Sequence, residues 1–508
     1  MRRYHVTTFG CQMNAHDSER IKGMLEELGL GEAVSQEEAD VLVFNTCTIR
    51  EKPDTKFAAH LADAIALKRR DPEKVIAVGG CYAEAQRERL FSLYPAVDVA
   101  FGPGSIPHLG EWLGAGGVGV ERGRFGIEER TFAGTLPQHR ERAFQAWVQI
   151  SMGCNSKCAY CIVPAVRGRE TSRRPGEIVA EVARLVGDGV REITLLGQNV
   201  NSWGRDLLPD IETEFGELLR ACDAIERVER IRFTSPHPKD FRAPVIAAMA
   251  ECLSVCEHAH LPLQSGSSRI LKAMRRAYRR DRYLAILDRV RASIPDAAIT
   301  TDVIVGFPGE TEEDFADTLD LVRRARFAGA FTFRYSIRPG TPAATMDGQV
   351  PAGVVQERYE RLTALVEETT YAENQKQAGT TVEVLVAEGE GRKDAATHRM
   401  SGRARDNRLV HFTPGQTAPG QVAPRPGDVV TVTVTRGAPH YLLSDATPLS
   451  VRRTRAGDAW EAAAAASPAP VSAAPVSAAP VSAAPVSADP VSAAAPVLLG
   501  MPARPPAG

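Results

Sequence analysis

Short apolar runs alternate with amphipathic stretches over the first 115 residues of the chain. Residues 4–8 are strand-like, residues 41–45 and 75–79 are apolar runs of strand length, and residues 18–28 have the spacing of a helix. Apolar runs of this length that alternate with helices are typical of a parallel sheet. We therefore predict an N-terminal α/β domain of the Rossmann or flavodoxin-like kind over residues 1–115.

A longer alternation of strands and helices follows and predicts a parallel barrel over residues 143–375. The strand candidates are residues 146–151, 192–196, 230–234, 258–263, 300–305 and 330–337. Helical patterns lie between them, for example over residues 177–186 and 312–326. Six strand–helix units in about 200 residues fit a partial or full β/α barrel. Residues 116–142 have weak periodicity and are predicted to be a linker.

The pattern changes again in the C-terminal part of the chain. Residues 380–386 and 428–435 alternate apolar and polar positions, which predicts a small all-β barrel over residues 376–448. From about Ala462 the chain consists of Ala, Pro, Ser and Val, with a proline at every fifth position. Such spacing blocks both helices and sheet ladders, so we predict a disordered tail over residues 449–508.

Composition narrows the class of protein. The 508 residues contain 61 Lys and Arg against 63 Asp and Glu, which excludes binding to nucleic acid by global charge alone. No apolar run approaches the roughly 18 residues of a membrane span, and the N-terminus has no apolar signal core. We expect a cytoplasmic protein without a membrane partner. Nine cysteines in such a chain favour metal binding or catalysis over disulfides.

Local groups of arginines are candidates for contact with RNA. Residues 392–408 contain six Lys and Arg against two Asp, which predicts either a basic rim on the β domain or an ordinary solvated loop. Two further runs lie in the barrel, where the alternative is plain helix-surface charge. Their cations are Arg167, Arg169, Arg173 and Arg174 in the first run, and Arg275, Arg276, Arg279, Arg280 and Arg282 in the second.

The strongest chemical signal is a trio of cysteines after the first barrel strand. Cys154, Cys158 and Cys161 lie within eight residues of one another. Three thiolates so close together can bind one face of an iron–sulfur cluster, which normally has four cysteine ligands. The missing fourth ligand leaves one iron open, as a catalytic metal needs. Zinc is the rival metal, although zinc ligands usually come as two pairs.

A second trio is dispersed along the N-terminal domain. Cys11, Cys47 and Cys81 each follow one of the three predicted strands. The carboxyl ends of parallel strands share one edge of a sheet, so these thiols are expected to meet in space. The alternative is a coincidence of buried thiols near strand ends.

Other residues have both a functional and a structural interpretation. Gly197, Gln198 and Asn199 end the second barrel strand, and Gly306 ends the fifth; they are candidate cofactor contacts or plain turn residues. Cys252, Cys256, His258 and His260 resemble a run of metal ligands, but we interpret the two thiols as buried residues of a helical pattern. The histidines face substrate or fill the core. Cys222 is interpreted as a core thiol.

The spacing of Cys154, Cys158 and Cys161, with Tyr160 before the last cysteine, resembles the radical S-adenosylmethionine (radical SAM) signature. The earlier trio narrows the resemblance to the methylthiotransferases, which have an N-terminal cluster domain, a radical barrel and a C-terminal β domain called TRAM. The resemblance covers about residues 1–448 and extends to residues 8–14, 45–51, 161–164, 167–170, 196–202 and 301–311. Tyr82 departs from the pattern, in which Met is more usual.

The resemblance implies a transferase with two [4Fe-4S] clusters. Cys154, Cys158 and Cys161 would hold the radical-generating cluster, and Cys11, Cys47 and Cys81 the sulfur-donating one. SAM would serve both as methyl donor and as radical source. The residues after Cys11, Gln12-Met13-Asn14, resemble the group that modifies C2 of N6-dimethylallyladenosine beside the tRNA anticodon.

The resemblance also suggests partners and leaves alternative functions to consider. The TRAM-like domain would bind the anticodon arm, a flavodoxin or ferredoxin would donate electrons, and the chain would be a monomer. The alternatives are methylthiolation of a ribosomal-protein aspartate or of threonylcarbamoyl-adenosine in tRNA, and a non-catalytic iron–sulfur RNA-binding protein.

Overall fold

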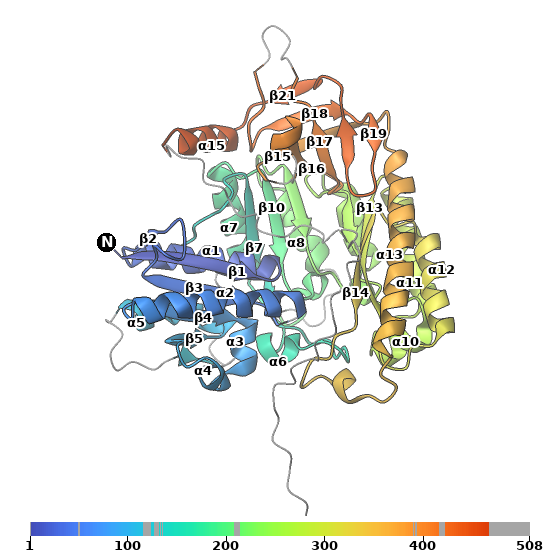
Figure 1. The fold of residues 1–508 in the computed structure, drawn as a ribbon. Coiled ribbons are helices and arrows are strands. Elements are labelled where there is room, and N and C mark those ends of the chain that lie inside the picture. Colours follow the sequence, from blue (N-terminus) through green and yellow to red (C-terminus); the bar gives the residue numbers. More distant parts are fainter. Residues whose placement is uncertain are drawn as a thin grey trace, which may run out of the picture.

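A parallel sheet of six strands forms the N-terminal domain of the computed structural model, with strand order β2-β1-β3-β4-β5-β6 (Figure 1). The structure describes residues 2–48, 51–114, 123–125, 132, 134, 136–207, 214–389, 391, 394–415 and 422–466. The strands of this sheet are β1 Arg3–Phe9, β2 Gly31–Glu32, β3 Val41–Thr46, β4 Val75–Gly80, β5 Val99–Phe101 and β6 Gly123–Arg124. The predicted N-terminal α/β domain is confirmed.

Helices cover both faces of this sheet because its strands are apolar at successive positions. In β3, Val41 and Val43 pack with Ile21, whereas Leu42 and Phe44 pack on the opposite face. Side chains alternate between the two faces of a strand, so a strand buried on both faces must be apolar throughout. The helices of the domain are α1 Gln12–Glu27, α2 Glu51–Arg70, α3 Cys81–Gln86, α4 Arg89–Leu93 and α5 Leu109–Gly114.

Six parallel strands in two three-stranded sheets form the central domain. One sheet has the order β11-β10-β7 and the other β12-β13-β14, and a bridge between Ile231 and Val255 connects them. The strands are β7 Gln145–Gln149, β10 Glu192–Leu196, β11 Arg230–Phe233, β12 His258–His260, β13 Ala298–Val305 and β14 Gly329–Arg334. All pairs within the two sheets are parallel. The predicted six β/α units are therefore present, and β7 and β14 are the outer strands.

The helices of the central domain pack against the outside of these strands (Figure 1). They are α7 Pro175–Gly187, α8 Glu214–Asp223, α9 Ala243–Glu251, α10 Ser268–Ala273, α11 Arg280–Ser293, α12 Glu312–Ala325 and α13 Ala352–Gln375. In α7, Ile178, Val182 and Leu185 follow the helical spacing of a buried face and join the largest hydrophobic core of the chain. The predicted helices at 177–186 and 312–326 are confirmed.

The C-terminal domain is a seven-stranded sheet with the order β19-β20-β17-β16-β15-β18-β21. Its strands are β15 Thr381–Ala387, β16 Met400–Ala404, β17 Leu409–Phe412, β18 Val429–Thr433, β19 Arg436–Gly437, β20 Leu442–Ser444 and β21 Ser450–Arg452. Alternating residues such as Val384, Val386, Val430 and Val432 form its core. The alternation in the sequence therefore predicted a small β domain correctly.

The predicted start of the disordered tail at residue 449 is wrong for residues 450–466. Strand β21 pairs with β18, and a helix, α15 Arg455–Ala466, follows it. Arg425 fixes this helix, because its guanidinium contacts Asp458 (2.8 Å) and Glu461. Alanine has the highest helix propensity, so the Ala-rich stretch before the first tail proline continues the helix. The rest of the predicted tail, residues 467–508, lies outside the described residues.

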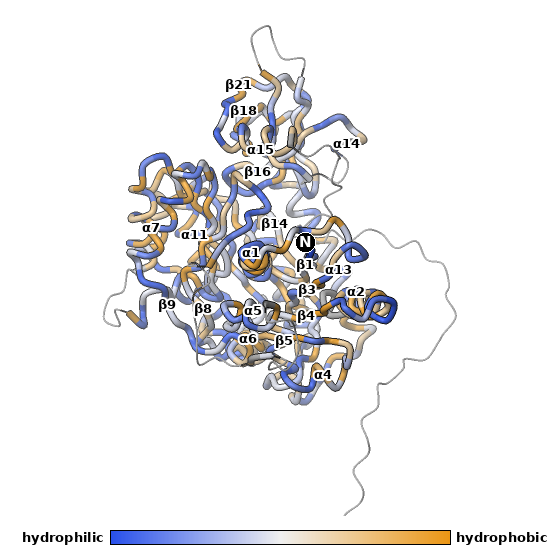
Figure 2. Tube along the Cα trace, turned by 90° about the vertical axis from the view of Figure 1, so that its left-hand side faces the viewer, coloured by the Kyte–Doolittle hydropathy of each residue, from blue (hydrophilic) through white to orange (hydrophobic). Residues whose placement is uncertain are grey.

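Arginines join the C-terminal domain to the amino ends of the barrel strands. Arg230 and Arg232 of β11 donate to the carbonyl oxygens of Arg403, Ala404 and Arg405 at 2.8–2.9 Å. In return, Arg405 contacts Glu257 (2.9 Å) just before β12. Figure 1 and Figure 2, whose views differ by 90°, both show this domain at the end of the molecule opposite helix α6 Val163–Arg167. No helix in the described ranges is long and apolar enough to cross a membrane.

A buried ion pair joins the N-terminal domain to the barrel. Arg20 of α1 contacts Glu181 of α7 at 2.8 Å, and both side chains are less than 5% exposed. Glu181 also accepts from the buried Arg173. Removing one member of such a pair leaves an uncompensated buried charge, so these contacts fix the relative position of the two domains.

Candidate functional site: two cysteine trios

The strands of the N-terminal sheet end in step and place three cysteines at one edge. Phe9 of β1 is paired with Thr46 of β3, and Thr46 with Gly80 of β4. Cys47 and Cys81 follow these strand ends directly, and Cys11 follows after Gly10. Cys47 and Cys81 are buried, while Cys11 is exposed. The dispersed trio is therefore assembled by strand register.

Gly10 makes the close approach between two of these loops possible. Its φ of +140° is rarely adopted by residues with a side chain, and a Cβ there would lie 2.5 Å from Cys47 Cβ. Cys11 stands at the start of α1, and a hydrogen bond with Cys47 lowers the pKa of Cys11 to about 6. A thiol with this pKa is largely thiolate at neutral pH, and the thiolate is the form that binds metal.

The second trio lies on the loop that follows the first barrel strand. A short hairpin of β8 Ser151–Met152 and β9 Thr171–Ser172 brackets this loop. Its backbone is fixed at several points: Cys154 N–H donates to Gly168 O at 3.0 Å, and Ala159 N–H donates to Met274 O at 3.0 Å. Cys161 N–H donates to Cys158 O at 3.2 Å, which turns the loop back on itself. The three thiols are thus held on one short, well-anchored segment.

Burial and one arginine control the charge of this second trio. Burial raises the pKa of Cys161 to about 12 and also raises that of Cys154. Arg276 Nη1 lies 3.4 Å from Cys158 Sγ and supplies the opposite charge. Metal binding must therefore displace protons from these thiols, because only thiolates are ligands.

The donor type of each trio suits an iron–sulfur cluster. Each set offers three free cysteines, and cluster thiolates bind different irons, so three of them leave one iron open. In the part of the chain that the structure describes, no three His, Cys, Asp or Glu side chains are arranged to hold one metal ion.

Arg167 links the barrel to one cysteine of the dispersed trio. It ends α6, six residues after Cys161, and its Nε donates to Cys81 Sγ at 3.2 Å. Its Nη2 donates to Asp17 Oδ2 of α1 at 2.8 Å. Helices α3 and α6 lie side by side at this point (Figure 1). The carboxyl ends of the strands in the two domains therefore face one another.

The structure changes the interpretation of the first arginine run. Arg167 and Arg173 are buried in ion pairs, so the prediction that they contact RNA is wrong. In the second run, Arg276 faces Cys158, and Arg280 pairs with Asp317 and Asp320. The sequence pattern could not separate the buried Arg167 from exposed arginines, because its acidic partner Asp17 lies 150 positions away.

The predicted basic rim of the C-terminal domain is also wrong for its described arginines. Arg405 docks on Glu257, Arg408 pairs with Asp406, and Arg399 contacts Asp445 at 2.5 Å. Arg403 donates to Asn407 O. Arg392 and Lys393 lie outside the described residues. The charge of these arginines therefore stabilises the domain and its attachment to the barrel.

The four candidate cofactor contacts lie at different distances from the cysteine loop. Gln198 Oε1 accepts from Gly153 N–H at 2.5 Å and so anchors the loop directly. Gly197 packs against Ser151. Asn199 donates to Asp240 at 3.1 Å, and its Oδ1 is buried without a partner among the described residues. Gly306 lies against Val355 of α13, where it forms a turn whose N–H donates to Glu310 at 2.8 Å.

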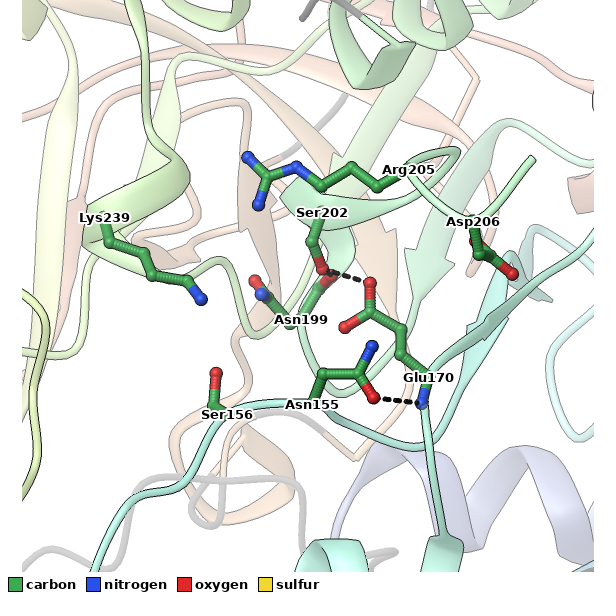
Figure 3. A pocket seen from close by; sticks show the side chains of 8 residues that line it. All are labelled: Asn155, Ser156, Glu170, Asn199, Ser202, Arg205, Asp206 and Lys239. Atoms are coloured by element: carbon green, nitrogen blue, oxygen red, sulfur yellow. Dashed lines mark hydrogen bonds between the residues drawn. The ribbon is translucent and has the colours of Figure 1, made fainter. Parts of the chain in front are cut away.

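A polar cavity of about 170 Å³ opens beside the cysteine loop (Figure 3). Its lining consists of Asn155, Ser156, Glu170, Asn199, Ser202, Arg205, Asp206 and Lys239. Ser202 Oγ donates to Glu170 Oε1 at 2.5 Å, and Glu170 N–H donates to Asn155 Oδ1 at 3.1 Å. Burial raises the pKa of Glu170. The cavity thus offers acidic and basic groups to one small ligand.

Several lining residues were not among the predicted site residues. Arg205, Asp206 and Lys239 belong to no motif, and Glu170 was noted only as part of the string 167–170 that carries the resemblance. Lys239 nevertheless lies in the segment after β11, and the segments that follow barrel strands form the active sites of such folds. Inspecting every strand end for charged residues would have found it.

The remaining candidates have structural positions. Cys222 and Cys252 belong to the barrel core, as interpreted from the sequence. Helix α9 ends at Glu251, so the placement of Cys252 and Cys256 on a helix is wrong; both thiols are nevertheless buried, as predicted. His258 and His260 both contact Thr300 Oγ1 of β13, at 2.9 and 3.0 Å. These histidines join the two neighbouring strands.

Comparison with known proteins agrees with this arrangement. The Radical SAM superfamily matches residues 148–322, and the Uncharacterized protein family UPF0004 matches residues 3–102. Together, the fold and the cysteine loop define a radical SAM protein with an added N-terminal domain. A solved radical S-adenosylmethionine methyltransferase, TsrM from Kitasatospora setae, has a similar fold. The TM-score is 0.51 at 14% identity, over 68% of this chain and 75% of that chain.

Sequence relatives identify the family. The tRNA-2-methylthio-N(6)-dimethylallyladenosine synthase of Kineococcus radiotolerans is 57% identical, over 91% of this chain and 92% of the relative. The protein of that name from Mycobacterium bovis is also 57% identical, over 90% of each chain. The chain belongs to the tRNA-2-methylthio-N(6)-dimethylallyladenosine synthase family.

Proposed function

We propose that this chain is a radical SAM methylthiotransferase that adds a methylthio group to C2 of N6-dimethylallyladenosine beside the anticodon of tRNA. The observation that carries the proposal is the contact of Arg167, six residues after the last cysteine of the barrel loop, with Cys81 and Asp17 of the N-terminal domain. One trio lies on the barrel loop of the radical SAM region and the other in the added domain. The relatives that match nine tenths of the chain are named for this reaction.

Two [4Fe-4S] clusters fit the two donor sets. Cys154, Cys158 and Cys161 would hold the radical-generating cluster, and Cys11, Cys47 and Cys81 the auxiliary one. When bound, the first cluster supplies the electron that cleaves SAM to a radical able to break the C2–H bond, and the second supplies sulfur. The protein would hold each cluster by three cysteines, which would leave one iron of each without a cysteine ligand.

The cavity beside the loop suits the amino-acid end of SAM. That group carries an ammonium and a carboxylate, and the cavity presents Glu170 and Asp206 as well as Arg205 and Lys239. The unpartnered Asn199 Oδ1 adds a buried acceptor among the described groups. Gly197 and Gln198 would act beside this site, because Gln198 accepts from Gly153 N–H and so anchors the cysteine loop. Gly306 is placed further along the strand ends, where it would shape the adenosyl side.

The RNA surface of the barrel would lie on the turn between α10 and α11. Four exposed cations gather there, with Asp281 as the exposed acid among them: Lys272, Arg275, Arg279 and Arg282. The same turn carries Arg276, which reaches Cys158, so RNA phosphates on this turn would lie beside the radical site. A target base must leave its stack to enter such a site.

The C-terminal domain would bind the anticodon arm as a TRAM-like module. It is attached at the amino ends of the strands, whereas the cysteine loop lies at their carboxyl ends. Strands β10 and β13 have five and eight residues and span roughly 17–27 Å, so an RNA that contacts both this domain and the cysteine loop would have to cover a similar distance. We further propose that the chain acts as a monomer in the cytoplasm, with a flavodoxin or ferredoxin as electron donor.

The test is mass spectrometry of nucleosides from prenylated tRNA. The tRNA is incubated with anaerobically reconstituted protein, reductant and SAM. We expect a 2-methylthio product and 5′-deoxyadenosine. If 5′-deoxyadenosine forms without a tRNA product, the substrate assignment is wrong, and the ribosomal protein becomes the substrate to test. If neither forms on a fully iron-loaded chain, the enzyme assignment itself is wrong.

A further inference from the structure

One guanidinium crosses the boundary between the two domains and contacts a cysteine of the auxiliary trio. Arg167 comes from the barrel, whereas Cys81 and Asp17 come from the N-terminal domain. Arg167, Asp17 and Cys81 are each no more than 4% exposed. Behind Asp17, His16 Nδ1 lies 3.4 Å from Asp17 Oδ1, and His16 is fully buried. The contact is therefore screened little by water.

The charges in this group are balanced in an unusual way. Burial raises the pKa of Asp17, but Arg167 and His16 outweigh it and lower the pKa below its usual range. Arg167 and Asp17 thus form a pair of opposite buried charges. A thiolate at Cys81 adds a second negative charge beside the same guanidinium. Cys81 Sγ therefore accepts a hydrogen bond from the charged guanidinium of Arg167. The strength of this hydrogen bond depends on Asp17, the other partner of Arg167.

We propose that Arg167 is a positioning residue for the auxiliary cluster, and that the Arg167–Asp17 pair sets the reduction potential of that cluster from across the domain interface. This proposal rests on the proposed function, because it requires a cluster on Cys11, Cys47 and Cys81. The radical barrel thereby controls the electronic state of the sulfur-donating site through one side chain.

The direction of the effect follows from electrostatics. Hydrogen bonds to cluster sulfurs and the net charge around them set the potential of an iron–sulfur cluster. A cation beside Cys81 favours the reduced, more negative cluster and so raises the potential. Asp17 weakens this effect by drawing the guanidinium and adding a negative charge. Losing Arg167 and losing Asp17 must therefore shift the potential in opposite directions.

The barrel trio offers a matched control. Arg276 Nη1 stands 3.4 Å from Cys158 Sγ, close to the 3.2 Å between Arg167 Nε and Cys81 Sγ. Each trio therefore has one arginine on one sulfur. Replacing Arg276 should shift the potential of the radical-generating cluster and leave the auxiliary cluster unchanged.

The experiment is a redox titration of the full-length, reconstituted chain followed by electron paramagnetic resonance. A variant with Cys154, Cys158 and Cys161 replaced by Ala assigns the auxiliary midpoint. We expect Arg167→Gln to move this midpoint to a more negative potential and Asp17→Asn to move it to a more positive one. The double variant Arg167→Gln/Asp17→Asn should lie between them, and Arg276→Gln should move only the other midpoint.

The outcomes separate this inference from the proposed function. A wild-type chain with a single cluster midpoint would overturn the auxiliary cluster itself. The chain can instead show two midpoints, with the auxiliary one unchanged or moved in the same direction in both single variants. That result would overturn only the role of Arg167. If Arg167→Gln does not fold, two other variants still test the role of Arg167. Asp17→Asn should move the auxiliary midpoint to a more positive potential than in the parent chain. The double variant should then lie at a more negative potential than Asp17→Asn.

Discussion

The two cysteine trios are built in different ways. Cys154, Cys158 and Cys161 share one loop, which backbone hydrogen bonds to Gly168 and Met274 anchor. Cys11, Cys47 and Cys81 come from three separate strands, and only the register of β1, β3 and β4 brings them together. The loop trio is partly exposed, whereas two thiols of the strand trio are buried. A local site tolerates distant changes, but a site assembled from strands depends on the packing of a whole domain.

Their electrostatic surroundings also differ. Each trio has an arginine on one sulfur, but only Arg167 shares its charge with a buried acid, Asp17. The loop trio obtains its arginine from its own barrel. The strand trio obtains it from the neighbouring domain, so its environment depends on domain docking.

The largest expected effects come from replacing one cysteine of each trio, because the two replacements should abolish different products. Cys47→Ala should abolish the methylthio product while 5′-deoxyadenosine still forms, because the radical site stays intact. Cys158→Ala should abolish both. Quantitative mass spectrometry of the nucleosides and of 5′-deoxyadenosine measures the two outcomes together. A methylthio product from the Cys47→Ala variant would refute the need for the strand trio.

Loss of the buried ion pair between the domains should affect the strand trio more than the loop trio. Glu181→Gln leaves Arg20 and Arg173 buried without their full counter-charge, and we expect a loss of about 3–5 kcal/mol in stability toward urea. The matched control is Glu177→Gln, since Glu177 is half exposed beside the same Arg173. Its change should stay within about 0.5 kcal/mol. Equal losses in both variants would show that burial does not decide the effect.

Gly10 tests the dependence of the strand trio on close packing. Gly10→Ala places a Cβ 2.5 Å from Cys47 Cβ at a φ of +140°, and we expect a loss of about 1–3 kcal/mol together with lower iron occupancy. Gly176→Ala is the control, because nothing lies within 4 Å of a Cβ there. Alanine is the better helix former, so this control should be neutral or slightly stabilising. Normal iron uptake by Gly10→Ala would contradict the packing argument.

The smallest expected effect is the contribution of His237 to the pH dependence of stability. Burial, Arg276 and Lys239 lower the pKa of His237 to about 2, so the folded chain keeps this histidine neutral. In the unfolded chain, His237 becomes protonated below its pKa of about 6.5. The contribution of the neutral His237 to the free energy of unfolding is therefore complete above that pH and is lost as the pH falls. Between about pH 7 and 5.5 the loss should be about 1 kcal/mol.

The variant that isolates this effect is His237→Asn. Asn can accept from Lys239 N–H as His237 Nδ1 does at 3.1 Å, and it does not titrate in this range. Urea unfolding at the two pH values compares the variant with the parent chain. The same pH dependence in both would mean that His237 is not the group responsible.

Local patterns of the sequence predicted most of the fold. The residues of β10 are those of the predicted strand at 192–196, since an isolated apolar run is a local signal. Residues 450–466 were missed because their order comes from contacts such as Arg425 with Asp458, 33 positions apart. The six cysteines could be identified from spacing and strand ends. The burial of Arg167 could not, because its partner Asp17 lies 150 positions away in another domain.

The cavity residues show the same limit. Glu170 and Ser202 meet across 32 positions, and Lys239 reaches the cavity from the end of another strand. The strings 167–170 and 196–202 carry the resemblance, but nothing in them shows that Glu170, Ser202 and Lys239 line one cavity. Strand order and register supply this information, and these are properties of the tertiary fold.

Iron content after selective loss of each trio tests the central claim most directly. Two variants are reconstituted anaerobically beside the parent chain, one with Cys11, Cys47 and Cys81 replaced by Ala and one with Cys154, Cys158 and Cys161 replaced. Two independent clusters predict that each variant keeps about half of the parent's iron and sulfide, with the Mössbauer signature of a [4Fe-4S] cluster. Full iron content in either folded variant, or loss of all iron in both, would contradict the account.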